Sequence, residues 1–172
     1  MTYASGGNGS PSHLTMAAFL VAAGAEMTHI PYKGTGASVL DVVAGQVDSL
    51  FAVGSGVIQH VKTGKLRALA VSSDKRSALA PDVPTVVEAG YPNFRASFAY
   101  ALLAPAGTPD AIVQLLAREV EAAMNTPELK ELNRGADYAT TGITQPAAAA
   151  AWLEATRKHW ADVIGKAKIT LD

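Results

Sequence analysis

The chain has 172 residues, of which 49% are hydrophobic and 17% are charged. This composition excludes a disordered protein and suits one well-packed core, or a small domain with part of another. The formal net charge is −1, with basic residues scattered singly or in pairs, so no nucleic-acid partner is expected. There is no cysteine, which excludes disulfides, thiolate metal sites and thiol nucleophiles.

The first expected elements are a strand and a helix joined by a glycine-rich corner. The strand is Thr2–Ser5, the helix is Pro11–Ala23, and the corner between them reads Ser-Gly-Gly-Asn-Gly-Ser. Ser10 suits the N-cap of the helix, and Pro11 suits its first position because the missing N–H costs nothing there.

This corner is predicted to bind an anion. We expect the main-chain N–H groups of Ser12, His13 and Leu14 to point out of the positive end of the helix. Such a terminus attracts a carboxylate or phosphate without a cationic side chain. The alternative is a simple helix cap in which Ser10 satisfies its own amides and His13 packs against the sheet.

Strand-like and helical segments continue to alternate as far as Ser72. The expected strands are Thr2–Ser5, Met27–Tyr32, Asp48–Val53 and Arg67–Ser72, and the expected helices are Pro11–Ala23, Gly36–Ala44 and Ser55–Thr63. Gly24, Gly45 and Gly64 follow the helices as left-handed C-terminal residues should. The alternation predicts an α/β fold with a mostly parallel sheet and flanking helices.

Three of these strands end in turns of small residues: Ser5–Ser10, 34–36 and 54–56. In a parallel sheet the carboxyl ends of the strands share one edge, where open α/β folds bind ligands. The three turns are therefore expected to line one cleft.

The rest of the chain is expected to be mainly helical. The expected elements are a short helix at Thr85–Ala89, a strand at Phe94–Ala104, a helix from Pro109 to Met124 or Asn125 with Thr108 as N-cap, a helix at Pro127–Asn133 ended by Gly135, a possible strand at Tyr138–Thr140, and a last helix from Pro146 through Trp160 to Ile164. Apolar stripes on these helices need a sheet to cover them. Too few strands are present for that, which suggests a missing part.

An ordered set of motifs covers nearly the whole chain. They are Gly7–His13 (GNGSPSH), Ile30–Gly34 (IPYKG), Ala44–Asp48 (AGQVD), Gly64–Val71 (GKLRALAV), Pro81–Thr85 (PDVPT), Glu88–Gly90 (EAG) and Ala104–Pro109 (APAGTP). In this order they resemble the Bug family, the substrate-binding proteins of tripartite tricarboxylate transporters.

The resemblance implies a periplasmic-binding-protein-like (type II) fold whose two lobes close around a small carboxylate. Residues 1–98 would form the second lobe, and residues 99–172 a crossover strand and the C-terminal helices of an incomplete first lobe. It also implies a periplasmic location and membrane permease partners, although no signal peptide is recognisable in this chain. The chain resembles an N-terminally truncated member.

The candidate ligand-binding residues are Asn8, Gly9, Ser10, Ser12, His13, Lys33 and Ser55. The serines and His13 match the carboxylate-binding turn of the family, with Asn8 and Gly9 shaping the turn. Lys33 would meet a second carboxylate or pair with a neighbouring acid. Ser55 would bind ligand or cap its helix, the cap being slightly favoured. The family often has polar residues after Phe51, where this chain has Ala52 and Val53.

Other conspicuous residues are assigned to structure. Asp48 is expected to serve as a turn or cap carboxylate, and His29 and His60 as surface or packed side chains. Trp152 and Trp160 are expected to be core anchors. No metal ligand set, cofactor or catalytic residue is predicted.

Three functions are weighed. The favoured one is a binding protein, or one lobe of one, whose affinity for dicarboxylates is weak or absent without the missing segment. A small enzyme lacks support, because the glycine turn matches neither a P-loop nor a dinucleotide fingerprint and no nucleophile elbow is present. The third is a truncated relic or fragment without ligand binding, which forms homodimers through its exposed C-terminal helices.

Overall fold

A computed structural model describes residues 1–96, 98–136, 138 and 145–170 of the chain. Two compact units are present: Met1–Phe98 together with Trp160–Asp172, and Ala99–His159. The predicted division after residue 98 coincides with the edge of the first unit, whereas residues 160–172 group with that unit. The assignment of either unit to a particular lobe remains a prediction.

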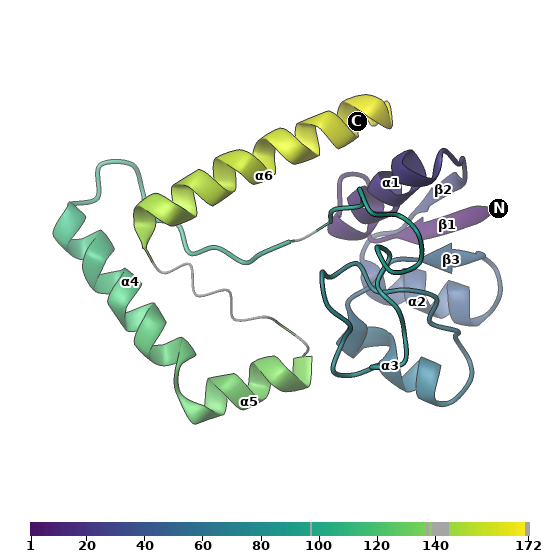
Figure 1. Cartoon of the computed structure of the whole chain (residues 1–172), viewed down its shortest axis with the longest axis horizontal. Coiled ribbons are helices and arrows are strands. Elements are labelled where there is room, and N and C mark those ends of the chain that lie inside the picture. Colours follow the sequence, from purple (N-terminus) through teal and green to yellow (C-terminus); the bar gives the residue numbers. More distant parts are fainter. Residues whose placement is uncertain (97, 137, 139–144, 171–172) are drawn as a thin grey trace. The chain divides into compact units, whose positions relative to one another are not determined.

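The first unit contains a three-stranded parallel sheet (Figure 1). Its strands are β1 (Thr2–Ser5), β2 (Thr28–Pro31) and β3 (Ser49–Leu50), in the order β2-β1-β3. Ala4 of β1 is in register with Ile30 on one side and Leu50 on the other. All pairs are parallel, which confirms the predicted α/β architecture and brings the three carboxyl ends to one edge.

Three helices connect these strands or follow them: α1 (Pro11–Ala23), α2 (Thr35–Val43) and α3 (Gly54–Lys62). The predicted bounds are correct for α1 and displaced by one residue for α2 and α3. Gly24, Gly45 and Gly64 have φ values of 60°, 74° and 73°, so the predicted left-handed residues after each helix are confirmed.

The core of this unit forms where α1 meets later segments of the chain. Its buried members are Ala17, Ala18, Val86, Phe94, Ala96, Trp160 and Val163. Phe19 lies at its margin, with its ring edge-on to Phe51, Tyr91 and Phe94. Trp160 stacks on Phe98 with 4.7 Å between ring centroids, which confirms its predicted role as a core anchor.

The predicted strand at Arg67–Ser72 is wrong. Only Val71 pairs, through an isolated parallel bridge to Thr85 in which Val71 N–H donates to Pro84 O and Val86 N–H donates to Val71 O. Pro81 and Pro84 lack N–H groups, so the segment opposite Val71 cannot extend the ladder.

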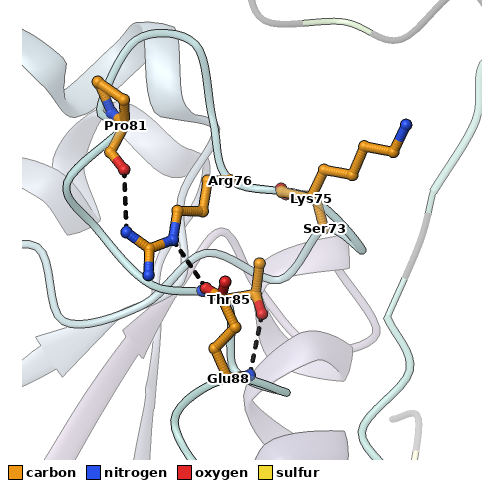
Figure 2. A network of polar contacts seen from close by, with 6 residues as sticks. All are labelled: Ser73, Lys75, Arg76, Pro81, Thr85 and Glu88. Atoms are coloured by element: carbon orange, nitrogen blue, oxygen red, sulfur yellow. Dashed lines mark hydrogen bonds and ion pairs between the residues drawn. The ribbon is translucent and has the colours of Figure 1, made fainter.

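The predicted helix at Thr85–Ala89 is also wrong, because a single turn held by reciprocal caps forms instead. Thr85 N–H donates to Glu88 Oε2 (2.8 Å), and Glu88 N–H donates to Thr85 Oγ1 (3.0 Å). Figure 2 shows Arg76 joining this turn, with its guanidinium donating to Glu88 (2.9 Å) and to Pro81 O (3.2 Å). Gly90, at a φ of 106°, follows the turn and prevents helix propagation.

The predicted strand at Phe94–Ala104 is absent from the described part of this segment, residues 94–96 and 98–104. Phe94 and Ala96 are buried in the core, but Tyr100 is 91% exposed. A strand needs a partner for its main-chain N–H and C=O groups, and none pairs with this segment among the described residues.

The remaining helices are α4 (Asp110–Met124), α5 (Pro127–Ala136) and α6 (Pro146–Lys166). The predicted start of α4 is one residue early: Pro109 is its N-cap, and Thr108 Oγ1 donates to Pro105 O (2.8 Å). Helix α5 runs through Gly135 instead of ending there. The possible strand at Tyr138–Thr140 lies, apart from Tyr138, outside the described residues.

The predicted apolar stripe of α4 is only partly covered in the described structure. Ile112, Leu115, Leu116 and Val120 are between 38% and 46% exposed. None of the described helices is both long and apolar enough to cross a lipid bilayer.

Candidate functional site

The turns after β1 and β2 lie directly against each other. Tyr32 N–H donates to Ser5 O (3.0 Å), and Gly34 N–H donates to Gly6 O (3.2 Å). A Cβ atom added to Gly7 would lie 3.1 Å from Tyr32 O, and Gly7 has a φ of 126°. Glycine is therefore required at this position by both space and conformation.

The serine pair at the start of α1 carries one hydroxyl proton more than its own contacts use. Ser10 Oγ accepts from His13 N–H (3.4 Å), and Ser12 Oγ accepts from Gly6 N–H (3.0 Å). The two oxygens lie 3.1 Å apart, so one hydroxyl donates to the other. The proton of the second hydroxyl has no acceptor among the residues that the structure describes, and it can be given to a bound anion.

The main-chain N–H groups of the turn are more fully used than the sequence predicts. Leu14 N–H donates to Ser10 O (2.9 Å), because an N-cap carbonyl already accepts the first helical hydrogen bond, and His13 N–H is capped by Ser10. The prediction of three outward donors is wrong for these two. Within the described chain, the N–H groups of Ser12 and Asn8 have no acceptor.

A stack of aromatic rings lies behind the turn. His13 is 5% exposed, and its ring stacks on His29 with 3.9 Å between centroids. His29 stacks in turn on Tyr3 at 4.8 Å. Of the two roles predicted for His29, a surface or a packed side chain, the structure shows the packed one.

Each imidazole also makes a polar contact in or beside the turn. Gly9 N–H donates to His13 Nδ1 (3.1 Å). His29 Nε2 lies 2.6 Å from Ser5 Oγ, which accepts from Gly7 N–H at 3.1 Å. The two histidines therefore support two different glycines of the corner.

The stack favours neutral imidazoles. Burial lowers the pKa of His13, and burial together with the nearby charge of His13 lowers the pKa of His29 to about 4. Burial raises the pKa of Tyr3. At neutral pH the site thus consists of uncharged donors and aromatic rings.

The other predicted ligand residues follow neighbouring strands. Lys33 follows β2, is exposed, and forms no ion pair among the described residues, so its predicted pairing with a neighbouring acid is not seen. Ser55 lies in the first turn of α3, where Val53 is the N-cap and no side chain caps the helix, so its favoured capping role is wrong. The sheet order places both residues after the carboxyl ends of strands, but no contact joins Ser55 to the corner in the described part of the chain.

Asp48 has a structural role, but it links two strands and is not the predicted turn or cap carboxylate. Its Oδ2 accepts from Thr2 N–H (2.6 Å) and from Thr2 Oγ1 (3.0 Å), which ties β3 to the first residue of β1. These hydrogen bonds lower the pKa of the Asp48 carboxyl.

Ser5 and His29 also belong to this corner, although neither is among the predicted ligand-binding residues. Ser5 is fully buried, and His29 is the residue paired with Tyr3 in the register between β1 and β2. A serine as the last residue of an apolar strand and a histidine on the next strand were the available signals, but their pairing depends on the strand register.

The arrangement can hold an anion with neutral donors, and it offers no evident centre for a metal ion. Three or more metal-ligating side chains do not gather anywhere in the described ranges. Hydroxyl and main-chain N–H donors beside the positive end of a helix suit an oxygen anion such as a carboxylate.

Comparison with known proteins agrees with this chemistry. Residues 1–167 match the model of the tripartite tricarboxylate transporter family receptor, TctC. The protein BugT of Bordetella pertussis is 37% identical over 156 residues, which are 91% of this chain and 48% of BugT. The chain thus spans about half the length of that curated relative.

Two solved structures have the same fold. The periplasmic binding protein BugD superposes with a TM-score of 0.82 at 31% identity, covering 98% of this chain and 57% of BugD. MatC of Rhodopseudomonas palustris, solved with bound malate, superposes with a TM-score of 0.76 at 26% identity, covering 95% of this chain and 56% of MatC. By the family model, sequence and fold together, the chain belongs to the receptor family of tripartite tricarboxylate transporters, which includes the Bug proteins.

Proposed function

We propose that this chain is a solute-binding protein, or a part of one, that captures a small organic carboxylate for a tripartite tricarboxylate transporter. The carboxylate is bound at the corner between β1 and α1. Its oxygens accept hydrogen bonds from the Ser12 and Asn8 N–H groups and from whichever of the Ser10 and Ser12 hydroxyls is not used internally. The role is capture and delivery, with no chemical step.

The observation that carries this proposal is the surplus of donors at the corner. Hydrogen bonds to a charged group contribute about 1.5–3 kcal/mol each when they replace water. Two or three of them suffice for a weak but specific site, and the dipole of α1 adds to them.

The second end of the ligand is assigned to the neighbouring turns. Lys33 follows the strand next to β1, and main-chain hydrogen bonds tie its turn to Gly6. An exposed ammonium at this place would pair with a second carboxylate, so a dicarboxylate such as the malate found in MatC is the favoured class. Ser55, in the turn after β3, would hydrogen-bond to the same ligand.

The transport role follows the family. Closure of two lobes around the ligand would present a new surface to the membrane permease, a population shift without catalysis. The periplasm is the location proposed for this event, as BugD is a periplasmic binding protein.

The test is calorimetry of the 172-residue chain with malate, using Ser12→Ala and a control serine, Ser73→Ala, which lies in an exposed loop. We expect saturable binding weaker than micromolar, because the chain spans about half of BugT. Loss of one hydroxyl and its contact to Gly6 should weaken malate binding about tenfold in Ser12→Ala and leave Ser73→Ala unchanged.

Absence of saturable malate binding by the parent chain, or equal binding by Ser12→Ala, would contradict carboxylate capture at this corner. Micromolar binding by the monomer would instead contradict the weak affinity expected of this length of chain.

A second candidate is a relic or fragment without ligand binding that associates through its helices. The apolar face of α4 favours it, since four large side chains there are more than a third exposed. Light scattering after size-exclusion chromatography distinguishes the two: a concentration-dependent dimer without malate binding supports this candidate, and a monomer that binds malate excludes it.

A further inference from the structure

The stacked pair of His13 and His29 does more than fill space behind the turn. One nitrogen of each ring makes a polar contact with the corner. His13 Nδ1 accepts from Gly9 N–H at 3.1 Å, and His29 Nε2 lies 2.6 Å from the Ser5 hydroxyl, which accepts from Gly7 N–H. Gly7 and Gly9 have φ values of 126° and 69°. Glycine turns of this kind have many alternative conformations, so the histidine contacts restrict them.

These contacts determine which donors are left for a ligand. Gly7 N–H donates to Ser5 Oγ and Gly9 N–H donates to His13 Nδ1, whereas the intervening N–H of Asn8 has no acceptor in the described structure. The main-chain oxygen of Gly7 accepts from Ser10 N–H (3.1 Å), which places the serine pair next to Asn8. The histidines thus act on the ligand through the main chain.

We propose that His13 and His29 are positioning residues of the carboxylate site: as a neutral stacked pair they hold the glycine corner in its ligand-ready conformation, and protonation of His13 releases it. This inference rests on the proposed function and assigns the control of that site. It replaces the expected direct contact between His13 and the ligand.

The electrostatic surroundings keep the pair neutral. No Asp, Glu, Lys or Arg occurs in β1, α1 or β2, and Tyr3 is the other titratable group in the stack. The charged residues closest along the chain are Glu26, Lys33, Asp41 and Asp48; Asp41 accepts from Tyr32 and Asp48 from Thr2, and none contacts either imidazole among the described residues. Two stacked imidazolium ions would repel each other without a nearby counter-ion.

A protonated His13 could not accept the Gly9 hydrogen bond. Its Nδ1 would carry a proton pointing at the Gly9 N–H, so the corner would have to open. The fraction of chains in the ligand-ready conformation falls, and the apparent dissociation constant rises by the same factor. A direct contact between protonated His13 and a carboxylate would have the opposite sign, with affinity rising on acidification.

The first measurement needs no ligand. In a ¹⁵N-labelled chain the N–H···N hydrogen bond predicts a scalar coupling between the Gly9 amide and His13 Nδ1, which is lost as His13 is protonated. Absence of that coupling in the neutral protein would overturn the inference, and it would do so whether or not the chain binds malate.

The second measurement uses three substitutions at His13 and malate as the probe. In His13→Asn the side-chain oxygen can take the place of Nδ1, in His13→Gln that of Nε2, and His13→Phe keeps a ring without an acceptor. Positioning through Gly9 predicts roughly three- to tenfold weaker binding by the Phe and Gln variants and a much smaller loss in the Asn variant. Better rescue by Gln than by Asn would show a direct contact through Nε2 and overturn the inference.

The pH profile completes the test. From about pH 7 to about pH 4.5, protonation of His13 should weaken malate binding by the parent relative to His13→Asn. The ratio of the two affinities is used because the ionisation of malate affects both proteins equally. A ratio that rises on acidification, or stays flat, contradicts the inference. His60→Asn, at a histidine of α3 outside the stack, should follow the parent. If no variant binds malate but the coupling is present, the proposed function fails and the positioning geometry stands.

Discussion

At the scale of single residues, the corner is held by side chains that hydrogen-bond within the turn and leave one hydroxyl donor unused. Ser10 and Ser12 each accept a main-chain N–H and share one hydroxyl proton between them. The same residues that close the turn therefore hold the donor left for a ligand. This unused hydroxyl donor can bind a carboxylate oxygen without any formal positive charge in the turn.

Gly7 provides a direct test of the close approach between the first two turns. Alanine at Gly7 must adopt a φ near 126° and place its Cβ 3.1 Å from Tyr32 O, whereas Gly90, at a φ of 106°, has no atom within 4 Å of that position. Strained backbone costs of order 1–3 kcal/mol in either case. We expect Gly7→Ala to lower the free energy of unfolding by about 1 kcal/mol more than Gly90→Ala, as measured by urea denaturation. Equal losses would refute the role assigned to the contact with Tyr32.

The lowered pKa of His29 should make the free energy of unfolding depend on pH. Its folded-state pKa is lowered to about 4, below the value of about 6.5 in an unfolded chain, so between these values the unfolded state binds more protons. The free energy of unfolding should fall as the pH drops from about 6.5 to about 4 and then receive no further change from this group. In His29→Gln the amide keeps a partner for Ser5 but cannot charge, so the slope should be shallower in denaturation curves across this range. A slope as steep as that of the parent would show that other groups cause it; His60→Gln is the matched control.

At the scale of elements, local patterns predicted the first half of the unit containing the sheet well. Ser10, Pro11 and Gly24 define both ends of α1, because capping depends on neighbours within one turn. The parallel order of β1 and β2 also followed from the alternation of strands and helices. The corner could be predicted as a donor-rich turn, but the stack of His13 on His29 could not, because it depends on strand register.

The elements that were predicted wrongly share a dependence on distant partners. Arg67–Ser72 has strand-like residues, yet only Val71 pairs, since Pro81 and Pro84 limit the opposite segment. Phe94–Ala104 has an apolar sequence, but no neighbouring strand pairs with its described residues. The residue pattern of a segment indicates whether it tends to be buried. It does not indicate whether another strand is available to pair with it.

The turn at Thr85 offers a test at this scale. Its reciprocal caps join Thr85 and Glu88, the main chain around Thr85 forms the bridge to Val71, and the Glu88 side chain pairs with Arg76. Glu88→Ala should cost about 1 kcal/mol of unfolding free energy, and Glu88→Gln less, because the amide oxygen can still accept from Thr85 N–H. Arg76→Met should cost less than Glu88→Ala, since half-exposed ion pairs contribute about 0–1 kcal/mol. Thermal or urea denaturation ranks the three; a larger loss in Arg76→Met would contradict the dominance of the caps.

At the scale of the whole molecule, burial is distributed unevenly along the chain. Helix α1 has five buried residues, whereas α4 and α5 have none among those described. The chain matches the TctC family model over residues 1–167, yet it spans only about half the length of BugT. Among the described helices after residue 98, α4 therefore carries four large apolar side chains that are more than a third exposed, whereas α6 contributes Trp160 and Val163 to the core.

Hydrogen exchange followed by mass spectrometry should reflect this distribution. Amides in β1 and α1 are expected to exchange more slowly than those in α4 and α5, because local opening costs more where buried contacts must be broken. The intrinsic exchange rate of each peptide, measured in urea, is the control. Equal protection in both sets would mean that the outer face of α4 is covered in solution, which light scattering would then identify as self-association or exclude.

The central claim is that the corner between β1 and α1 holds a carboxylate through main-chain and serine donors. A ¹H–¹⁵N NMR titration of the full chain with malate tests it most directly, because it locates the ligand residue by residue. We expect saturable shifts of the Asn8 and Ser12 amides, with little change in α4 or α5. In Ser12→Ala the remaining shifts should reach saturation only at about tenfold higher malate concentration. Shifts confined to other residues, with the Asn8 and Ser12 amides unmoved at saturation, would contradict it.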